Sequence, residues 1–115
     1  MSRHDPIVTL RQMLDHAQEA SDMAAGRTRA DLERDRLLYL ALTRLLQIVG
    51  EAANRMPADW QQRLPGIPWA QVVSLRNRLT HGYDEVDLDI LWEIVVDDLP
   101  PLIDALEEAL RDPAP

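Results

Sequence analysis

Apolar residues recur at spacings of three, four and seven along most of the chain, which is the pattern of amphipathic helices. Residues 5–6 (Asp-Pro) suit the N-cap and first position of a helix, and Gly26 suits its end, so a first helix is predicted between them. Thr28 with Asp31 has the form of a capping box. It predicts a second helix that starts there and ends before Pro57.

The second half of the chain continues the helical pattern after a proline-rich interval. Residues 57–68 hold three prolines and a glycine, which predicts a loop with one short turn around Trp60. A third helix is predicted from Pro68 to about Thr80, and a fourth begins with Asp87 as its cap. We expect residues 100–101 (Pro-Pro) to kink this last helix, because neither residue has an amide hydrogen.

The pattern as a whole predicts an all-α protein. No segment alternates with a period of two over the length of a strand, so no strand is expected. Short connections between the helices favour an up-and-down bundle of four to five helices, with a kinked C-terminal helix. At 115 residues the chain is expected to form a single domain, residues 1–115.

Composition narrows the classes of protein that need to be considered. The chain has no cysteine, which excludes disulfides and thiolate metal sites. The N-terminal residues lack the apolar stretch of a signal peptide, and no run approaches the ~20 apolar residues of a membrane span. We therefore expect a cytoplasmic protein without a membrane partner. No cluster with the spacing of metal ligands stands out, so neither a metal nor another cofactor is expected.

Charge is distributed unevenly along the chain. The formal net charge is −8, and all twelve basic residues are arginines. Residues 1–81 carry eleven arginines against nine acidic residues, whereas residues 82–115 carry one arginine against eleven acidic residues. Tight nonspecific binding along nucleic acid needs many phosphate contacts, so this composition disfavours it. A small, local arginine site remains compatible with the sequence, and the acidic part fits a solvated helix face or a surface for a basic partner.

The run RNRLTHGY, residues 76–83, is the strongest chemical signal. Arg76 and His81 are five residues apart, and on an unbroken helix their side chains would diverge by about 140°. They converge only if the helix ends between them, and Gly82 is placed to end it. His81 would then lie near a helix C-terminus, where the helix dipole favours its protonated form.

An arginine beside such a histidine suits RNA cleavage through attack by the 2′-hydroxyl. The imidazole transfers protons while the guanidinium stabilises the charge that develops on phosphorus, and no metal is required. The residue types alone favour a simpler interpretation, in which Arg76 and His81 are a surface side chain and a helix cap.

The full string resembles the Arg-x4-His-x-Tyr motif of HEPN-domain proteins, and closely resembles the HepT toxins of HepT–MntA systems. The resemblance covers residues 48–102, including IVGEAANRM and PGIPWAQVVSLRNRLTHGYDEVDLDILWEIVVDDLPPL. Residues 1–47 match only in the arrangement of helices and in apolar spacing.

Membership of this family would imply several properties. These are a HEPN-type helical bundle, a homodimer that brings two motifs into one basic cleft, and metal-independent ribonuclease activity. Arg76 and His81 match the catalytic pair. Tyr83 matches the tyrosine that the partner MntA, a minimal nucleotidyltransferase, modifies with AMP. Asn77 follows the arginine as is common in the family, and either supports His81 or the phosphate or caps the helix end.

Several other residues have both a structural and a functional interpretation. Glu51 is expected to form an ion pair with Arg76 or Arg55 rather than act as a base. Arg78 either contacts phosphate or is a solvated surface residue. For four acidic residues after the motif, helix capping is favoured over a divalent ion: Asp84, Glu85, Asp87 and Asp89. Core or dimer contacts are expected for Trp69 and Trp92, and Trp60 is expected to be more exposed.

The sequence is therefore compatible with two functions. The first is a toxin endoribonuclease of a type VII-like toxin–antitoxin system, completed by dimerisation and silenced by adenylylation of Tyr83. The second is a non-catalytic HEPN module that binds nucleotide or a nucleotidyltransferase partner, which the acidic charge would suit. The intact pair of Arg76 and His81 favours the enzyme.

Overall fold

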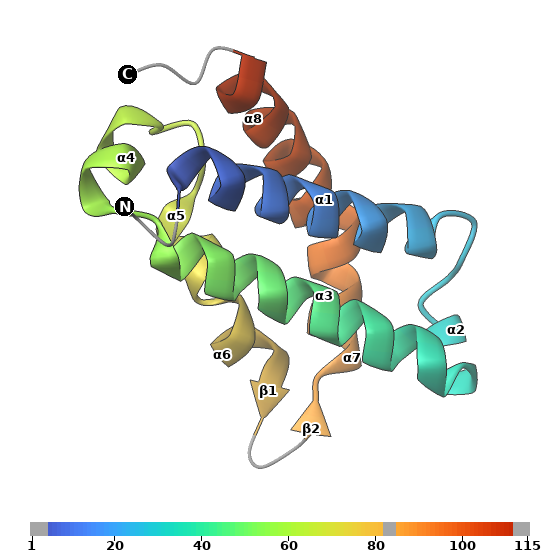
Figure 1. The fold of residues 1–115 in the computed structure, drawn as a ribbon. Coiled ribbons are helices and arrows are strands. Elements are labelled where there is room, and N and C mark those ends of the chain that lie inside the picture. Colours follow the sequence, from blue (N-terminus) through green and yellow to red (C-terminus); the bar gives the residue numbers. More distant parts are fainter. Residues whose placement is uncertain (1–4, 82–84, 112–115) are drawn as a thin grey trace.

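The computed structural model describes residues 5–81 and 85–111, and for His81 and Glu85 it describes the backbone alone. Figure 1 shows a mainly helical molecule in which α1 (Pro6–Ala24) and α3 (Arg36–Arg55) lie side by side and run in opposite directions. Helix α8 (Leu99–Arg111) packs against α1, and a short hairpin extends from the body beyond the middle of α3. The predicted fold class is confirmed.

Helix α1, Pro6–Ala24, begins and ends as the sequence predicts. The carboxylate of Asp5 accepts a hydrogen bond from the amide of Ile7 at 2.9 Å, and Pro6 occupies the first turn. Just after the helix, Gly26 has a φ of 76°, a conformation that side chains other than that of glycine rarely adopt.

The predicted second helix is two helices, α2 (Asp31–Arg34) and α3 (Arg36–Arg55). Asp35 separates them with an extended backbone, φ −120° and ψ 94°. Its carboxylate accepts from the amide of Leu38 at 3.1 Å and from the guanidinium of Arg27 at 2.8 Å. The prediction of one continuous helix was wrong because this side chain caps a new helix. The hydrogen bond from Arg27 is the main cause of the lowered pKa of Asp35.

The proline-rich interval contains the short helix α4, Ala58–Arg63, as the predicted turn around Trp60. The predicted third helix is interrupted: α5 covers Trp69–Val73 and α6 covers Leu75–Leu79. Ser74 lies between them with φ −84° and ψ 2°, and its hydroxyl donates to the carbonyl of Gln71 at 2.9 Å. Such local bonds compete with a continuous helix, which accounts for the break.

A small antiparallel hairpin follows α6, and the sequence pattern did not predict it. Strand β1 (Thr80–His81) pairs with β2 (Glu85–Val86). Two residues per strand are too few for an alternating pattern to be visible in the sequence.

The last predicted helix consists of α7 (Leu88–Glu93), a π-helical segment η1 (Ile94–Asp98) and α8 (Leu99–Arg111). The amide of Leu99 donates to the carbonyl of Ile94, five residues earlier, which is the hydrogen bond of a π-helix. Pro100 and Pro101 cannot donate to the carbonyls four residues before them. The predicted disturbance at these prolines thus takes the form of a wider turn that precedes them.

Buried apolar side chains from α1, α3, α5, α6, α7, η1 and α8 form one cluster. Among its fully buried members are Leu10, Met13, Leu42, Leu46 and Leu106. Gly50 lets α3 approach α5 closely, because a Cβ at this position would lie 3.1 Å from the carbonyl oxygen of Val72. Among the described residues, no helix has the length and apolarity that would let it cross a bilayer.

Candidate functional site

Helix α6 presents the first residues of the RNRLTHGY run. Leu75 and Leu79, one turn apart, are buried with exposures of 3% and 0%, and they attach this short helix to the core. Successive residues of an α-helix are about 100° apart, so Asn77 faces away from the core. Arg76 and Arg78 project to opposite flanks of α6. Arg76 and Asn77 are exposed, whereas Arg78 is half-buried.

The helix ends between Arg76 and His81, as convergence of the two residues requires. It ends at Leu79, because Thr80 has an extended backbone with φ −104° and ψ 125°. The hydroxyl of Thr80 donates to the carbonyl of Arg76 at 3.2 Å, and the carbonyl of Leu79 accepts from the amide of Asp87 at 2.8 Å. The end of α6 therefore precedes Gly82, which was expected to cause it. Gly82 and Tyr83 lie outside the described residues.

The hairpin places the backbone of His81 opposite Glu85, and Thr80 opposite Val86. Directly after it, the carboxylate of Asp87 accepts from the amides of Asp89 and Ile90 at 3.0 and 3.1 Å. Asp87 is thus the N-cap of α7, in agreement with the prediction that capping explains it.

The neighbouring acidic residues have separate positions. The carboxylate of Asp89 accepts from Arg29 at 2.7 Å, while Asp84 lies outside the described residues. Within the described part of the chain, no group of three histidine or acidic side chains is arranged to hold a metal ion.

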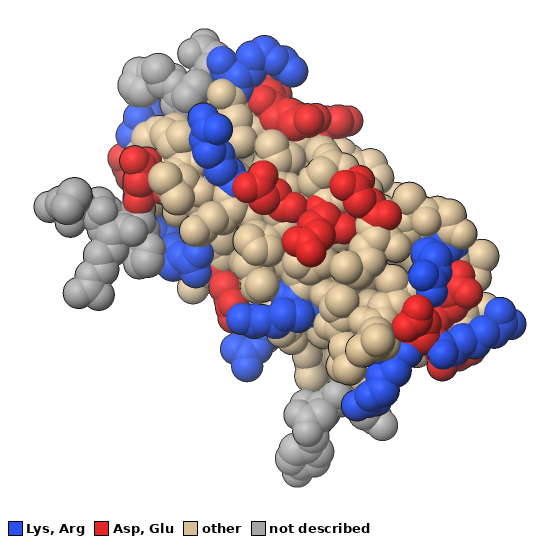
Figure 2. Space-filling model, turned by 45° about the vertical axis from the view of Figure 1, so that its right-hand side comes forward, with Lys and Arg blue, Asp and Glu red and all other residues tan. Residues whose placement is uncertain are grey.

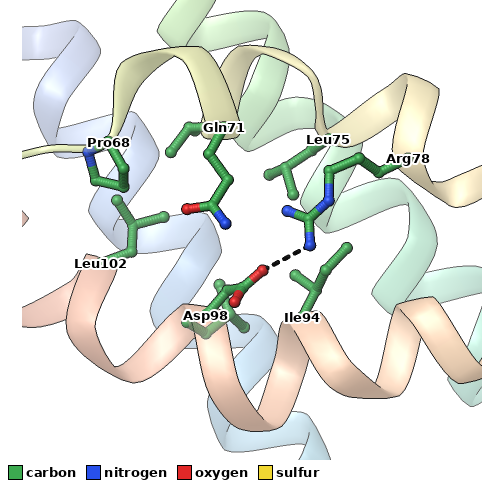
Figure 3. A pocket seen from close by; sticks show the side chains of 9 residues that line it. Pro68, Gln71, Leu75, Arg78, Ile94, Asp98 and Leu102 are labelled. Atoms are coloured by element: carbon green, nitrogen blue, oxygen red, sulfur yellow. Dashed lines mark hydrogen bonds and ion pairs between the residues drawn. The ribbon is translucent and has the colours of Figure 1, made fainter.

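The two arginines of α6 have different partners. Within the described residues, Arg76 is exposed and has no carboxylate partner. Arg78 forms an ion pair with Asp98 of η1, with its Nη2 2.9 Å from the carboxylate. Figure 3 shows this pair bridging a small hollow between α6 and η1. Arg78 is therefore half-buried and ion-paired, not the solvated surface residue of one interpretation, while the phosphate contact of the other interpretation stays a prediction.

Other predicted partners also differ from the expectation. Glu51 forms an ion pair with Arg44, 3.5 Å away and two turns earlier on α3, and among the described residues it forms none with Arg76 or Arg55. Arg55 instead donates to the side chain of Gln12 at 3.2 Å. The side chain of Asn77 forms no hydrogen bond with another described residue and does not cap α6, and its expected support of His81 stays a prediction.

The tryptophans contribute mainly to packing. Trp69 is buried, and its indole donates to the carbonyl of Leu64 at 3.0 Å. Trp92 is half-buried and packs against the core, as expected. Trp60 is half-buried as well, with the guanidinium of Arg63 5.0 Å from its ring centre.

Arginines and acidic residues are interleaved over the face of the molecule in Figure 2. On the described part of that face, the arginines do not merge into a continuous basic surface. Several of them pair with carboxylates, for example Arg27 with Asp31 and Asp35 at 3.5 and 2.8 Å. This arrangement suits one local anion site better than a long track for nucleic acid.

Comparison with known proteins assigns the chain to a family. Residues 13–109 match the model of the family described as ribonuclease HepT-like. A "putative RNase" of Methanocaldococcus jannaschii is 29% identical over 112 residues, which cover 97% of this chain and 93% of that protein. A second "putative RNase" of the same organism is 30% identical over 102 residues, or 89% of this chain and 94% of the relative.

A "probable ribonuclease HepT" of Thermococcus cleftensis is 38% identical over 68 residues, which cover 59% of this chain and 62% of that protein. No solved structure gives a significant match. The family match covers α1 from Met13 onward, all of α3, the motif and most of α8. The chain therefore belongs to the HepT-like ribonucleases and, as a member of that family, is a ribonuclease.

Proposed function

We propose that this ribonuclease is a toxin endoribonuclease whose catalytic residues are Arg76 and His81. The observation that carries the proposal is the position of Arg76. Its guanidinium is exposed, has no carboxylate partner among the described residues, and lies one turn before the end of α6. An arginine in this state can bind the phosphate of RNA without first breaking an ion pair.

The chemistry follows from the two residue types. The 2′-oxygen of a ribose attacks the adjacent phosphorus, and the bond from phosphorus to the 5′-oxygen of the next nucleotide breaks. His81 takes the proton of the attacking hydroxyl or delivers one to the leaving oxygen, and Arg76 stabilises the additional negative charge in the transition state. The products are a 2′,3′-cyclic phosphate and a 5′-hydroxyl, and no metal takes part. We include Asn77 as a supporting residue, because it is exposed beside Arg76.

Two further properties belong to the proposal. The chain acts as a homodimer, in which two copies of the motif share one cleft and two histidines can supply an acid and a base. Its cognate antitoxin is a minimal nucleotidyltransferase of the MntA type, which silences it by adenylylating Tyr83. The name of the Thermococcus cleftensis relative, a HepT ribonuclease, supports placing the chain in such a system.

Digestion of RNA in excess chelator tests the chemistry. The wild-type chain should cleave RNA internally, and His81→Ala should lower the rate by roughly 10²- to 10⁴-fold, the usual effect of losing a proton-transfer group. Arg76→Ala should act in the same direction. Arg11→Ala is the matched control, because Arg11 is also exposed without a carboxylate partner in the described structure but lies on α1.

The ends of the products separate this chemistry from other routes of cleavage. A 2′,3′-cyclic phosphate is expected on the upstream fragment. Cleavage that survives His81→Ala, or that stops when the chelator is added, would contradict the mechanism. Nucleotide binding by a wild-type chain that leaves RNA intact would instead support the non-catalytic module, which the net charge of −8 favours.

A further inference from the structure

We propose that Arg78 is a positioning residue, which holds α6 and thereby Arg76 in place through its ion pair with Asp98. This inference rests on the proposed function. In this role Arg78 does not contact the substrate. It acts on the protein, by joining the helix that carries the motif to the π-helical segment η1.

Helix α6 needs such an attachment because it is short. It has five residues, about one and a half turns, and it is bounded by the break at Ser74 and the extended Thr80. A helix of this length has little stability of its own, so tertiary contacts decide its position. Leu75 and Leu79 bury one face of α6, and a contact on its flank adds to the resistance against rotation about the helix axis.

The ion pair acts on one flank of α6 and so resists that rotation. The Arg78 Nη2 and the Asp98 carboxylate are 2.9 Å apart, and each side chain is 26% exposed. Figure 3 shows the guanidinium directed from α6 across to η1. Because Arg76 projects from the opposite flank, a rotation of α6 that broke the ion pair would also move the Arg76 guanidinium.

The surroundings of Arg78 favour this role over binding of phosphate. Its Nη1 atom is buried and has no hydrogen-bond partner within the described structure, so it is not presented to solvent. The adjoining cavity has a volume of about 20 Å³ and is lined mostly by apolar side chains. That volume admits a water molecule but not a nucleotide.

The position of Asp98 has its own cause in the sequence. Pro100 and Pro101 cannot donate to the carbonyls of residues 96 and 97, and the chain forms the wider π turn that ends at Asp98. A π turn accommodates an additional residue, and so changes the direction in which the following side chains face. The two prolines thus contribute to placing the carboxylate that holds α6.

Cleavage kinetics of matched variants test the proposal. Arg78→Gln and Asp98→Asn should each lower kcat by about 10- to 100-fold, because a misplacement of about 1 Å costs up to that factor, and KM should change little. Arg78→Lys should retain part of the kcat that Arg78→Gln loses. The double variant Arg78→Asp with Asp98→Arg, which exchanges the two charges, should have a higher kcat than Arg78→Asp alone or Asp98→Arg alone. The control is Arg63→Gln, which breaks an ion pair of 2.8 Å within α4 and should leave kcat unchanged.

The opposite pattern would overturn the proposal. If Arg78 binds phosphate, Asp98→Asn should leave cleavage unchanged or increase it, and Arg78→Gln should mainly raise KM and weaken the salt dependence. Thermal unfolding of each variant shows whether a fall in kcat comes from a misplaced Arg76 or from a chain that no longer folds. Arg78→Lys is the mildest of these changes. A wild-type chain that does not cleave RNA would overturn the proposed function and this inference together. Active wild type with fully active variants would overturn this inference alone.

Discussion

Arg76 and Arg78 show how strongly two similar residues can differ in their surroundings. They lie two positions apart on a five-residue helix, and the 200° between them turns one toward solvent and the other toward Asp98. The exposed guanidinium is suited to bind an anion. The half-buried one already has an anion within the protein. A sequence pattern that counts arginines cannot separate these two roles.

At the same scale, Tyr83 carries a prediction about regulation, although it lies outside the described residues. Incubation with the cognate nucleotidyltransferase and ATP should raise the intact mass by one or more AMP units and stop RNA cleavage. An adenylate would add bulk and a negative charge to the motif and so compete with the RNA phosphate for Arg76. Tyr83→Phe should prevent both effects.

Tyr39→Phe is the matched control, because Tyr39 is the other of the two tyrosines in the chain. It lies half-buried on α3 with its ring 5.9 Å from the guanidinium of Arg36. This variant should be modified and silenced like the wild type. Normal modification of the Tyr83→Phe protein would show that the acceptor is a different residue.

At the scale of elements, the packing of α3 against α5 and α6 sets the position of the motif. At Gly50 an added Cβ would lie 3.1 Å from the carbonyl oxygen of Val72 and 3.5 Å from the Cβ of Leu75. Such distances leave no room for a branched side chain unless α5 moves. The glycine is therefore required by the close approach of two elements rather than by a turn.

We predict that Gly50→Val lowers the free energy of unfolding by about 1–3 kcal/mol, the usual cost of overpacking. Urea unfolding measures it. Asn54→Val, one turn later on α3 and exposed, should change the free energy by about 0.5 kcal/mol or less. If both variants have the same stability, the contact between α3 and α5 is more adaptable than the structure indicates.

At the scale of the whole molecule, the distribution of charge limits how RNA can be bound. The net charge is −8, and several arginines are paired with carboxylates. Six of the twelve arginines have a carboxylate partner in the described structure, so a single chain offers fewer free cations to RNA than its arginine count suggests. A two-fold dimer would place a second set beside the first, because a symmetric contact repeats the same residues in both copies.

A homodimer is accordingly predicted, with a mass about twice the 13.1 kDa of the chain. Light scattering after size exclusion measures the mass. Cleavage per chain should fall on dilution in parallel with the dimer fraction, since the site is completed by the partner copy. A monomer at micromolar concentration with full activity would contradict a shared cleft.

The sequence by itself determined the helical class and the ends of several elements. Helical spacing of apolar residues is a local property, and so are the cap at Asp5, the glycine at position 26 and the cap at Asp87. The motif, read with its flanking residues, indicated the family that the comparisons confirm. Each of these signals lies within a few consecutive residues, which is why it could be read from the chain.

Only the tertiary structure decided the partners of side chains and the breaks within helices. Arg78 and Asp98 are twenty residues apart, and Glu51 has Arg44 as its partner because both lie on one face of α3. The hydrogen bonds at the breaks, from Leu38 to Asp35 and from Ser74 to Gln71, are local, but the same residues also fit a continuous helix, so the sequence alone does not decide between the two. Ion pairs between elements depend on packing angles and register, and these arise from the whole core rather than from any local run of residues.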